Sequence, residues 1–154
     1  MGENLPPVAQ LVPQQQPMML LERICDCGED FIECAVTAGR AKAPQLEEGR
    51  IAVWTGLEYM AQTLAAFAGV HAFRAGTDVR KGVVLGSRKM QCMVSSFEEG
   101  QQLLIRAEPL SDNGEVGVFH CEIRDAQSSR LLMCGTLSVY KPEDFAVLLQ
   151  GRGQ

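Results

Sequence analysis

The sequence predicts an α+β domain in which a six-stranded antiparallel sheet wraps around one long central helix. Three observations lead to this fold class: a single long apolar stretch, strand-like segments separated by short turns, and the order of two strands, a helix and four strands. With 154 residues, of which 46% are apolar, the chain is long enough to bury a core without disulfides or metal. One domain is therefore expected over residues 18–142.

The segments outside that domain are expected to carry little regular structure. Residues 1–17 contain four prolines, Pro6, Pro7, Pro13 and Pro17, and such a segment predicts an irregular arm. Residues 143–154 are expected to form a C-terminal tail. The hydrophobic core is therefore expected to be formed by residues 18–142.

The first part of the domain is predicted to be a hairpin followed by a long loop. Residues 18–24 and 31–36 alternate in the way that strands do, and Gly28 lies in the turn between them. Residues 37–49 lack periodicity and contain Gly39, Pro44 and Gly49. These residues are therefore expected to form a long loop that leads from the hairpin into the central helix. Loops of this length in compact domains are often functional.

The central helix is predicted over residues 53–73 and is apolar on nearly every side. Apolar residues recur at the i, i+3 and i+4 positions, and the few polar side chains include Thr55, Glu58 and Gln62. A helix without a polar face is normally buried. Gly76 follows it as the expected C-terminal cap.

Four strands are predicted after the helix, at residues 83–94, 102–110, 116–124 and 131–140. Turn signals separate them at residues 97–100, 111–114 and 125–129, and each signal has the length that joins neighbouring antiparallel strands. These strands complete the sheet of six.

The composition excludes several functions. A net charge of -5 and 6% aromatic residues argue against a nucleic-acid surface. The chain has no signal peptide and no apolar run of membrane length, so a cytoplasmic protein without membrane contact is expected. Its six cysteines should then be reduced and act as small buried hydrophobes. Cys25 and Cys27 are spaced like metal ligands, but no second pair completes a site, so no metal is expected.

A local concentration of positive charge stands out from the acidic whole. Arg74, Arg80, Lys81, Arg88 and Lys89 place five of the fourteen cations within sixteen residues. These cations can serve as a docking patch for an acidic partner, or they can cap the helix and solubilise a loop and a strand. The residues alone favour the second interpretation.

Two motifs resemble those of the 3-hydroxyacyl-[acyl-carrier-protein] dehydratases, which have the hot-dog fold. Residues 13–24, PQQQPMMLLERI, resemble the opening segment of that family, and residues 56–62, GLEYMAQ, resemble the start of its central helix. The sequence LGSR at residues 85–88 extends the match. The resemblance is closest to the branch associated with aryl polyene biosynthesis, and it covers about residues 13–142.

The resemblance implies a reaction and a site. In this family a 3-hydroxyacyl thioester, carried on the phosphopantetheine of an acyl carrier protein or on coenzyme A, enters a tunnel at a dimer interface and loses water. It implies no other cofactor, and it implies a homodimer or a heterodimer with another hot-dog subunit. The implied site residues are Glu58 and Gln62 for catalysis, Thr55, Gly56, Leu57, Leu85 and Gly86 for substrate binding, and Arg80, Lys81, Arg88 and Lys89 for docking of the acidic carrier.

The chain departs from the family pattern at both of its motif histidines. The catalytic histidine, fourteen residues before the carboxylate, is replaced by Pro44, and the histidine of the opening motif is replaced by Gln14. His71 and His120 are interpreted as buried, hydrogen-bonded structural residues. Glu58 also has a structural alternative, because Thr55 and Glu58 have the spacing of a helix capping box.

Three functions therefore remain open from the sequence. The first is a dehydratase in which Glu58 is the remaining catalytic group and Gln62 orients it. The second is an acyl thioesterase, because hydrolysis needs only a carboxylate, a water molecule and a helix N-terminus. The third is a non-catalytic subunit that binds acyl chains or completes the tunnel of a partner that carries the histidine.

Overall fold

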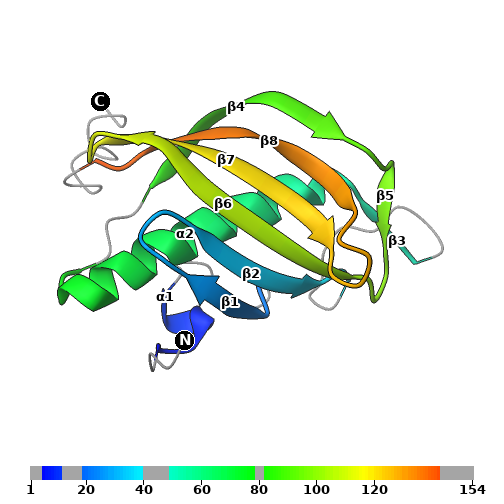
Figure 1. Ribbon diagram of the computed structural model, residues 1–154, viewed down its shortest axis with the longest axis horizontal. Coiled ribbons are helices and arrows are strands. Elements are labelled where there is room, and N and C mark those ends of the chain that lie inside the picture. Colours follow the sequence, from blue (N-terminus) through cyan, green and yellow to red (C-terminus); the bar gives the residue numbers. More distant parts are fainter. Residues whose placement is uncertain (1–4, 12–18, 40–48, 79–81, 143–154) are drawn as a thin grey trace, which may run out of the picture.

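The computed structural model describes residues 5–11, 19–39, 49–78 and 82–142. A six-stranded antiparallel sheet, in the order β1-β2-β6-β7-β8-β4, curves around the long helix α2 (Figure 1). This is the predicted α+β architecture of the hot-dog fold. The elements are α1 (Val8–Leu11), β1 (Arg23–Cys27), β2 (Ile32–Thr37), β3 (Arg50–Ala52), α2 (Thr55–Ala75), β4 (Val83–Cys92), β5 (Ser96–Glu98), β6 (Gln102–Asp112), β7 (Val116–Asp125) and β8 (Leu131–Tyr140).

The four strands after the helix agree with their predicted positions. Strands β4, β6, β7 and β8 each begin at the expected residue and end within two residues of the expected end. The turns between β6, β7 and β8 are held by side chains that accept backbone N–H groups. Asp125 accepts from the amides of Gln127 and Ser128, and Asn113 accepts from the amides of Glu115 and Val116. This local turn chemistry explains why these boundaries could be predicted.

The first hairpin is displaced along the chain from its predicted position. Strand β1 covers Arg23–Cys27 rather than residues 18–24. The turn closes where the Gly28 amide donates to the Phe31 carbonyl at 2.9 Å. Met19 and Leu21, which suggested a strand, are buried without belonging to the sheet. Burial of apolar residues in an irregular segment therefore imitated the strand pattern.

Strands β3 and β5 were not predicted. They pair only with each other, and Ile51 lies opposite Phe97 in a second, two-stranded sheet. Phe97, predicted to lie in a turn, is fully buried. The loop predicted at residues 37–49 falls largely outside the described residues and leads directly into β3. Strands of three residues are too short to give an alternating pattern.

Helix α2 begins and ends two residues later than predicted. Its C-terminus is a Schellman motif, in which Gly76 has φ 68° and its amide and the Thr77 amide donate to Phe73 and Ala72. The helix is covered on both sides. Strands β2, β6 and β7 pack on one side, and α1 packs against it elsewhere with Val8 and Leu11 buried. The predicted irregular arm is therefore wrong for Val8–Leu11.

The contact between α1 and α2 depends on Gly69. A methyl group at Gly69 would lie 2.3 Å from the Leu11 carbonyl oxygen and 2.9 Å from its Cβ. Such separations are impossible without movement of backbone. The absence of a side chain at this position therefore allows the N-terminal arm to lie directly on the helix.

The cysteines agree in part with the prediction. Cys27, Cys34 and Cys121 are buried, whereas Cys92 is exposed, so the expectation of a buried hydrophobe is wrong for Cys92. Burial raises the pKa of the Cys34 and Cys121 thiols to about 12, so both remain protonated and unreactive at neutral pH.

Among the described residues, no group of His, Cys, Asp and Glu side chains is arranged to hold a metal ion. No helix in the described ranges is long and apolar enough to cross a membrane.

Replacing Gly69 with alanine should displace the N-terminal arm. The new methyl group meets backbone atoms of Leu11, and overpacking of this kind costs about 1–3 kcal/mol, against about 1 kcal/mol gained in helix propensity. We expect faster proteolysis before β1 and a lower denaturant midpoint. Gly86→Ala is the matched control, because Gly86 has open space around it. Equal effects of both substitutions would contradict the prediction.

Candidate functional site

Glu58 and Gln62 lie together on α2, as the helical spacing predicted. The Gln62 Nε2 atom donates a hydrogen bond to Glu58 Oε1 at 2.9 Å. Glu58 is half-buried and lies in the first turn of the helix. Within the described part of the chain, no donor contacts its other carboxylate oxygen. One oxygen is therefore held by the protein, and the other remains available to a ligand.

The orientation of Gln62 is set by a backbone group far away in the sequence. The Leu20 amide donates to Gln62 Oε1 at 2.7 Å, across 42 residues of sequence, and Gln62 is fully buried. Because Oε1 accepts from a backbone N–H, the amide has only one orientation, and its Nε2 must donate toward Glu58. Leu20 was missed by the sequence analysis, and no local signal marks its role.

The capping-box explanation of Glu58 is wrong. Helix α2 begins at Thr55, its N-cap residue is Trp54, and no side chain caps it. Thr55 lies inside the first turn, and Glu58 contacts Gln62 instead of reaching back to a cap amide. Glu58 therefore has no helix-capping role that would explain its presence.

The start of α2 brings three of the predicted substrate-binding residues, Thr55, Gly56 and Leu57, next to Glu58. The amides of Gly56 and Leu57 donate to the carbonyls of Val53 and Trp54 at 2.9 and 3.1 Å. These two amides are therefore engaged at the start of the helix.

One side of the helix start is closed and the other is open. A methyl group on Gly56 would lie 2.5 Å from the Met133 sulfur and 3.0 Å from Ile123 Cδ1, so the helix rests directly on the sheet there. Trp54 is 58% exposed and Leu57 is 36% exposed. The side of the helix start that carries Trp54 and Leu57 is therefore exposed to solvent.

The other two predicted substrate-binding residues do not join the site within one chain. Leu85 and Gly86 lie on the edge strand β4, and Gly86 is opposite Ser138 of β8. Met133, which contacts the helix start, lies five residues earlier on β8, or roughly 17 Å along a strand. Leu85 is 59% exposed. A substrate-binding role for Leu85 and Gly86 therefore stays a prediction, and it would require a second subunit whose site includes these two residues.

The predicted basic segment divides into residues with different positions. Arg88 and Lys89 are exposed on β4, and Lys89 has a left-handed φ of 55° where the pairing with β8 is irregular. Arg80 and Lys81 lie outside the described residues. Arg74 donates to the Cys27 carbonyl at 2.9 Å and so ties the end of α2 to β1, which is a structural role.

Neither histidine of the chain lies near Glu58. His71 is thirteen residues further along α2, which is about 20 Å, and contacts the Phe67 ring edge at a centroid distance of 4.5 Å. His71 is exposed, so the expectation that it is buried is wrong. His120 is half-buried, and its Nε2 lies 3.1 Å from Glu122 Oε2. No histidine of this chain can therefore act beside Glu58.

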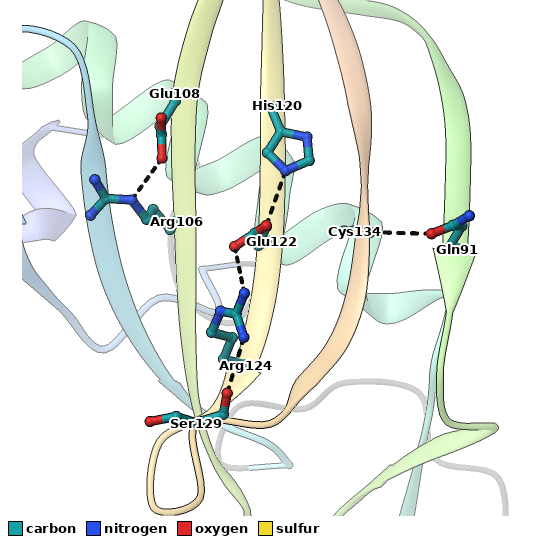
Figure 2. Close-up of polar contacts among 8 residues, drawn as sticks. All are labelled: Gln91, Arg106, Glu108, His120, Glu122, Arg124, Ser129 and Cys134. Atoms are coloured by element: carbon teal, nitrogen blue, oxygen red, sulfur yellow. Dashed lines mark hydrogen bonds and ion pairs between the residues drawn. The ribbon is translucent and has the colours of Figure 1, made fainter.

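His120 belongs to a ladder of charges on the outer face of the sheet. Figure 2 shows His120, Glu122 and Arg124 following one another along β7, beside the ion pair of Arg106 and Glu108 on β6. Burial opposes ionisation of Glu122, but the hydrogen bonds and charges of His120 and Arg124 outweigh it, so the pKa of Glu122 is lowered. These charges satisfy one another, so we assign this face a structural role.

Comparisons with known proteins agree on the fold and identify a family. A family model described as ApeP dehydratase, of the ApeP-like type, matches residues 6–150. The chain is similar to a structure described as the dehydratase heterocomplex ApeI:P from Xenorhabdus doucetiae, with 27% identity and a TM-score of 0.88. That match covers 98% of this chain and 100% of the other. A search of curated proteins found no match.

More distant structures share the fold alone. A hypothetical thioesterase from Streptococcus pneumoniae TIGR4, solved with coenzyme A, is 12% identical with a TM-score of 0.57, and the match covers 78% of this chain and 84% of the other. Zebrafish thioesterase superfamily member 2 is 10% identical with a TM-score of 0.64, and the match covers 88% and 91%.

Removing the Gln62 amide should destabilise the protein more than neutralising Glu58. Gln62→Leu leaves the Leu20 amide without its acceptor, which costs about 1–3 kcal/mol. Glu58→Gln retains an oxygen that can accept from Gln62, so its cost should stay below about 1 kcal/mol. Denaturant unfolding of both variants measures the difference. A smaller loss in Gln62→Leu than in Glu58→Gln would refute the bridging role.

Proposed function

Because this chain belongs to the ApeP-like dehydratase family, we propose that it is a dehydratase subunit that acts on a 3-hydroxyacyl thioester. The acyl chain would be carried on the phosphopantetheine of an acyl carrier protein or of coenzyme A, with no further cofactor. The observation that supports this most directly is the carboxylate of Glu58, which Gln62 and the Leu20 amide orient at the start of α2.

The proposed reaction is an elimination of water. A proton leaves C2, the bond between C3 and the hydroxyl oxygen breaks, and the hydroxyl leaves as water after it receives a proton. A trans double bond remains between C2 and C3. Glu58 is suited to take the C2 proton, because one carboxylate oxygen accepts from Gln62 and no described residue contacts the other.

A second group must protonate the leaving hydroxyl, and we propose that a partner subunit supplies it. Both histidines of this chain lie away from Glu58. The similar structure from Xenorhabdus doucetiae is described as a heterocomplex of two components. A hot-dog partner that retains a histidine would complete the acid and base pair across the interface.

The exposed edge of β4 supports a partner of this kind. This ten-residue strand pairs with β8 along one edge, and within the described residues no strand pairs with the other edge. Val84 is 43% exposed and Leu85 is 59% exposed. The free edge of a long strand can pair with a strand of another chain, and such pairing beside Val84 and Leu85 would bring Leu85 and Gly86 into a shared interface.

Acyl thioester hydrolysis is the second candidate. The shared fold with thioesterases and a carboxylate without a histidine beside it both suit hydrolysis, in which Glu58 would activate water. The third candidate is a subunit that binds the acyl chain without catalysis. The three candidates differ in the mass of the product.

Incubation with a 3-hydroxyacyl carrier protein, followed by mass spectrometry, tests the proposal. We expect loss of 18 mass units, the mass of water, when the chain is combined with a histidine-bearing hot-dog subunit. The chain alone should give little product, because it lacks the second proton-transfer group. Glu58→Gln should abolish the loss of water because an amide cannot take the C2 proton.

The partner subunit alone and the Glu58→Gln chain bound to it are the controls. Loss of the acyl group would favour thioester hydrolysis instead. Unchanged substrate, with the chain, the partner and the carrier all bound, would favour the non-catalytic role. Full activity of the Glu58→Gln complex would refute a catalytic Glu58.

We also propose that the exposed cations Arg88 and Lys89 on β4, together with Arg80 and Lys81, dock the carrier protein. Carrier proteins are acidic, and complementary surface charge mainly accelerates association. Arg88→Glu should slow carrier association about tenfold at low salt, with a smaller effect at high salt. Arg130→Glu, in the β7–β8 turn, is the matched control. An equal effect of both variants would indicate that only net charge matters.

A further inference from the structure

Thr55 carries a buried hydroxyl group that has no partner. The residue is 2% exposed, and its Oγ1 is the one buried side-chain nitrogen or oxygen among the described residues that makes no hydrogen bond. A buried hydroxyl without a partner lowers stability, so its presence requires an explanation. A group from outside the isolated chain would supply the missing partner.

Two other buried polar side chains on α2, those of Gln62 and Thr63, are satisfied within the chain. Gln62 bonds at both ends of its amide. Thr63, also fully buried, donates from Oγ1 to the Tyr59 carbonyl at 2.8 Å. The two buried threonines of this helix therefore differ in one respect: the hydroxyl of Thr63 has a partner, and that of Thr55 does not.

The place of Thr55 indicates what kind of atom its hydroxyl would meet. It is the first residue of α2, and side chains on a helix tilt toward its N-terminus, where the helix dipole favours negative charge. Glu58 lies three residues later, on the same face. The Gly56 and Leu57 amides already donate to Val53 and Trp54, so the Thr55 hydroxyl is a donor that remains for a ligand oxygen.

We propose that the Thr55 hydroxyl donates a hydrogen bond to the thioester carbonyl oxygen of the bound acyl substrate. The assignment deepens the proposed function and rests on it, because it takes an acyl thioester as the ligand. When the C2 proton leaves, negative charge develops on that carbonyl oxygen. A donor at the positive end of a helix stabilises this charge.

The structure also indicates how the ligand reaches Thr55. The Gly56 side of the helix start is closed by Met133 and Ile123. Trp54 and Leu57, which flank that pair in the sequence, are exposed, and exposed side chains change rotamer within nanoseconds. These mobile side chains near Thr55 in the sequence leave the approach of a ligand to the Trp54 and Leu57 side of the helix start.

Binding of two matched probes to the full chain in complex with a hot-dog partner tests the assignment. The probes are 3-hydroxyoctanoyl-pantetheine and the corresponding thioether, which lacks the carbonyl oxygen. A Glu58→Gln background prevents turnover during the titration. Adding Thr55→Val should weaken thioester binding about tenfold, the size of one buried hydrogen bond, and leave thioether binding unchanged. Thr55→Ser should restore thioester binding.

Stability gives an independent readout. Thr55→Val removes a hydroxyl without a partner, so its denaturant midpoint should equal or exceed that of the parent. Thr63→Val is the matched control, because it removes a hydroxyl that is bonded, and its midpoint should fall. A similar fall in Thr55→Val would mean that the hydroxyl has a partner inside the folded chain, and would overturn the assignment.

The remaining outcomes separate this inference from the proposed function. Equal thioester affinity with and without the Thr55 hydroxyl, or equal loss for both probes, would overturn the inference alone. Selective loss of thioester affinity in a complex that releases no water would support the inference and contradict dehydration. A parent complex that binds neither probe would overturn both.

Discussion

The need to cover helix α2 on both sides determines much of this structure. The helix is apolar almost all round, and twelve of its twenty-one residues are buried, so a single sheet face cannot shield it. The curved sheet covers one side, and α1 packs against the helix at Gly69. Gly56, in the first turn, allows a close approach to the Met133 side chain of the sheet. The two glycines thus let the helix backbone lie against the backbone of Leu11 and against the side chains of Met133 and Ile123.

Burial of the helix also decides how its polar groups behave. A buried amide or hydroxyl must find a partner or lower the stability of the fold. Gln62 meets this requirement by joining the Leu20 backbone to Glu58, and Thr63 meets it within the helix. The same interaction that satisfies Gln62 also orients the carboxylate. Stability and the candidate chemistry therefore depend on one side chain.

Within the described residues, the candidate site contains one of the two proton-transfer groups that the proposed reaction needs. Glu58 is oriented, yet His71 lies toward the far end of α2 and His120 is engaged with Glu122 on the outer face. The open edge of β4 exposes Val84 and Leu85, where another strand can add. The complementary subunit proposed above would account for both the missing proton-transfer group and the open edge.

Much of the fold was predictable because its signals are local. The apolar periodicity of α2, the Gly76 cap and the turns at Asn113 and Asp125 depend on residues a few positions apart. The contact of Glu58 with Gln62 is likewise one helical turn. The segment at Met19 and Leu21 was wrongly predicted to be a strand, because apolar residues that are buried outside a sheet produce the same sequence pattern as a strand.

The sequence by itself therefore determined the order of the long helix and the six strands of the main sheet, the burial of that helix and the carboxylate at its start. Only the tertiary structure decided the pairing of β3 with β5, the packing of α1 on Gly69, the tie from Leu20 to Gln62 and the unpaired hydroxyl of Thr55. These features join residues that are distant along the chain or depend on what surrounds a buried atom. No periodicity or short motif in the sequence predicts such contacts, because they form only when the chain folds.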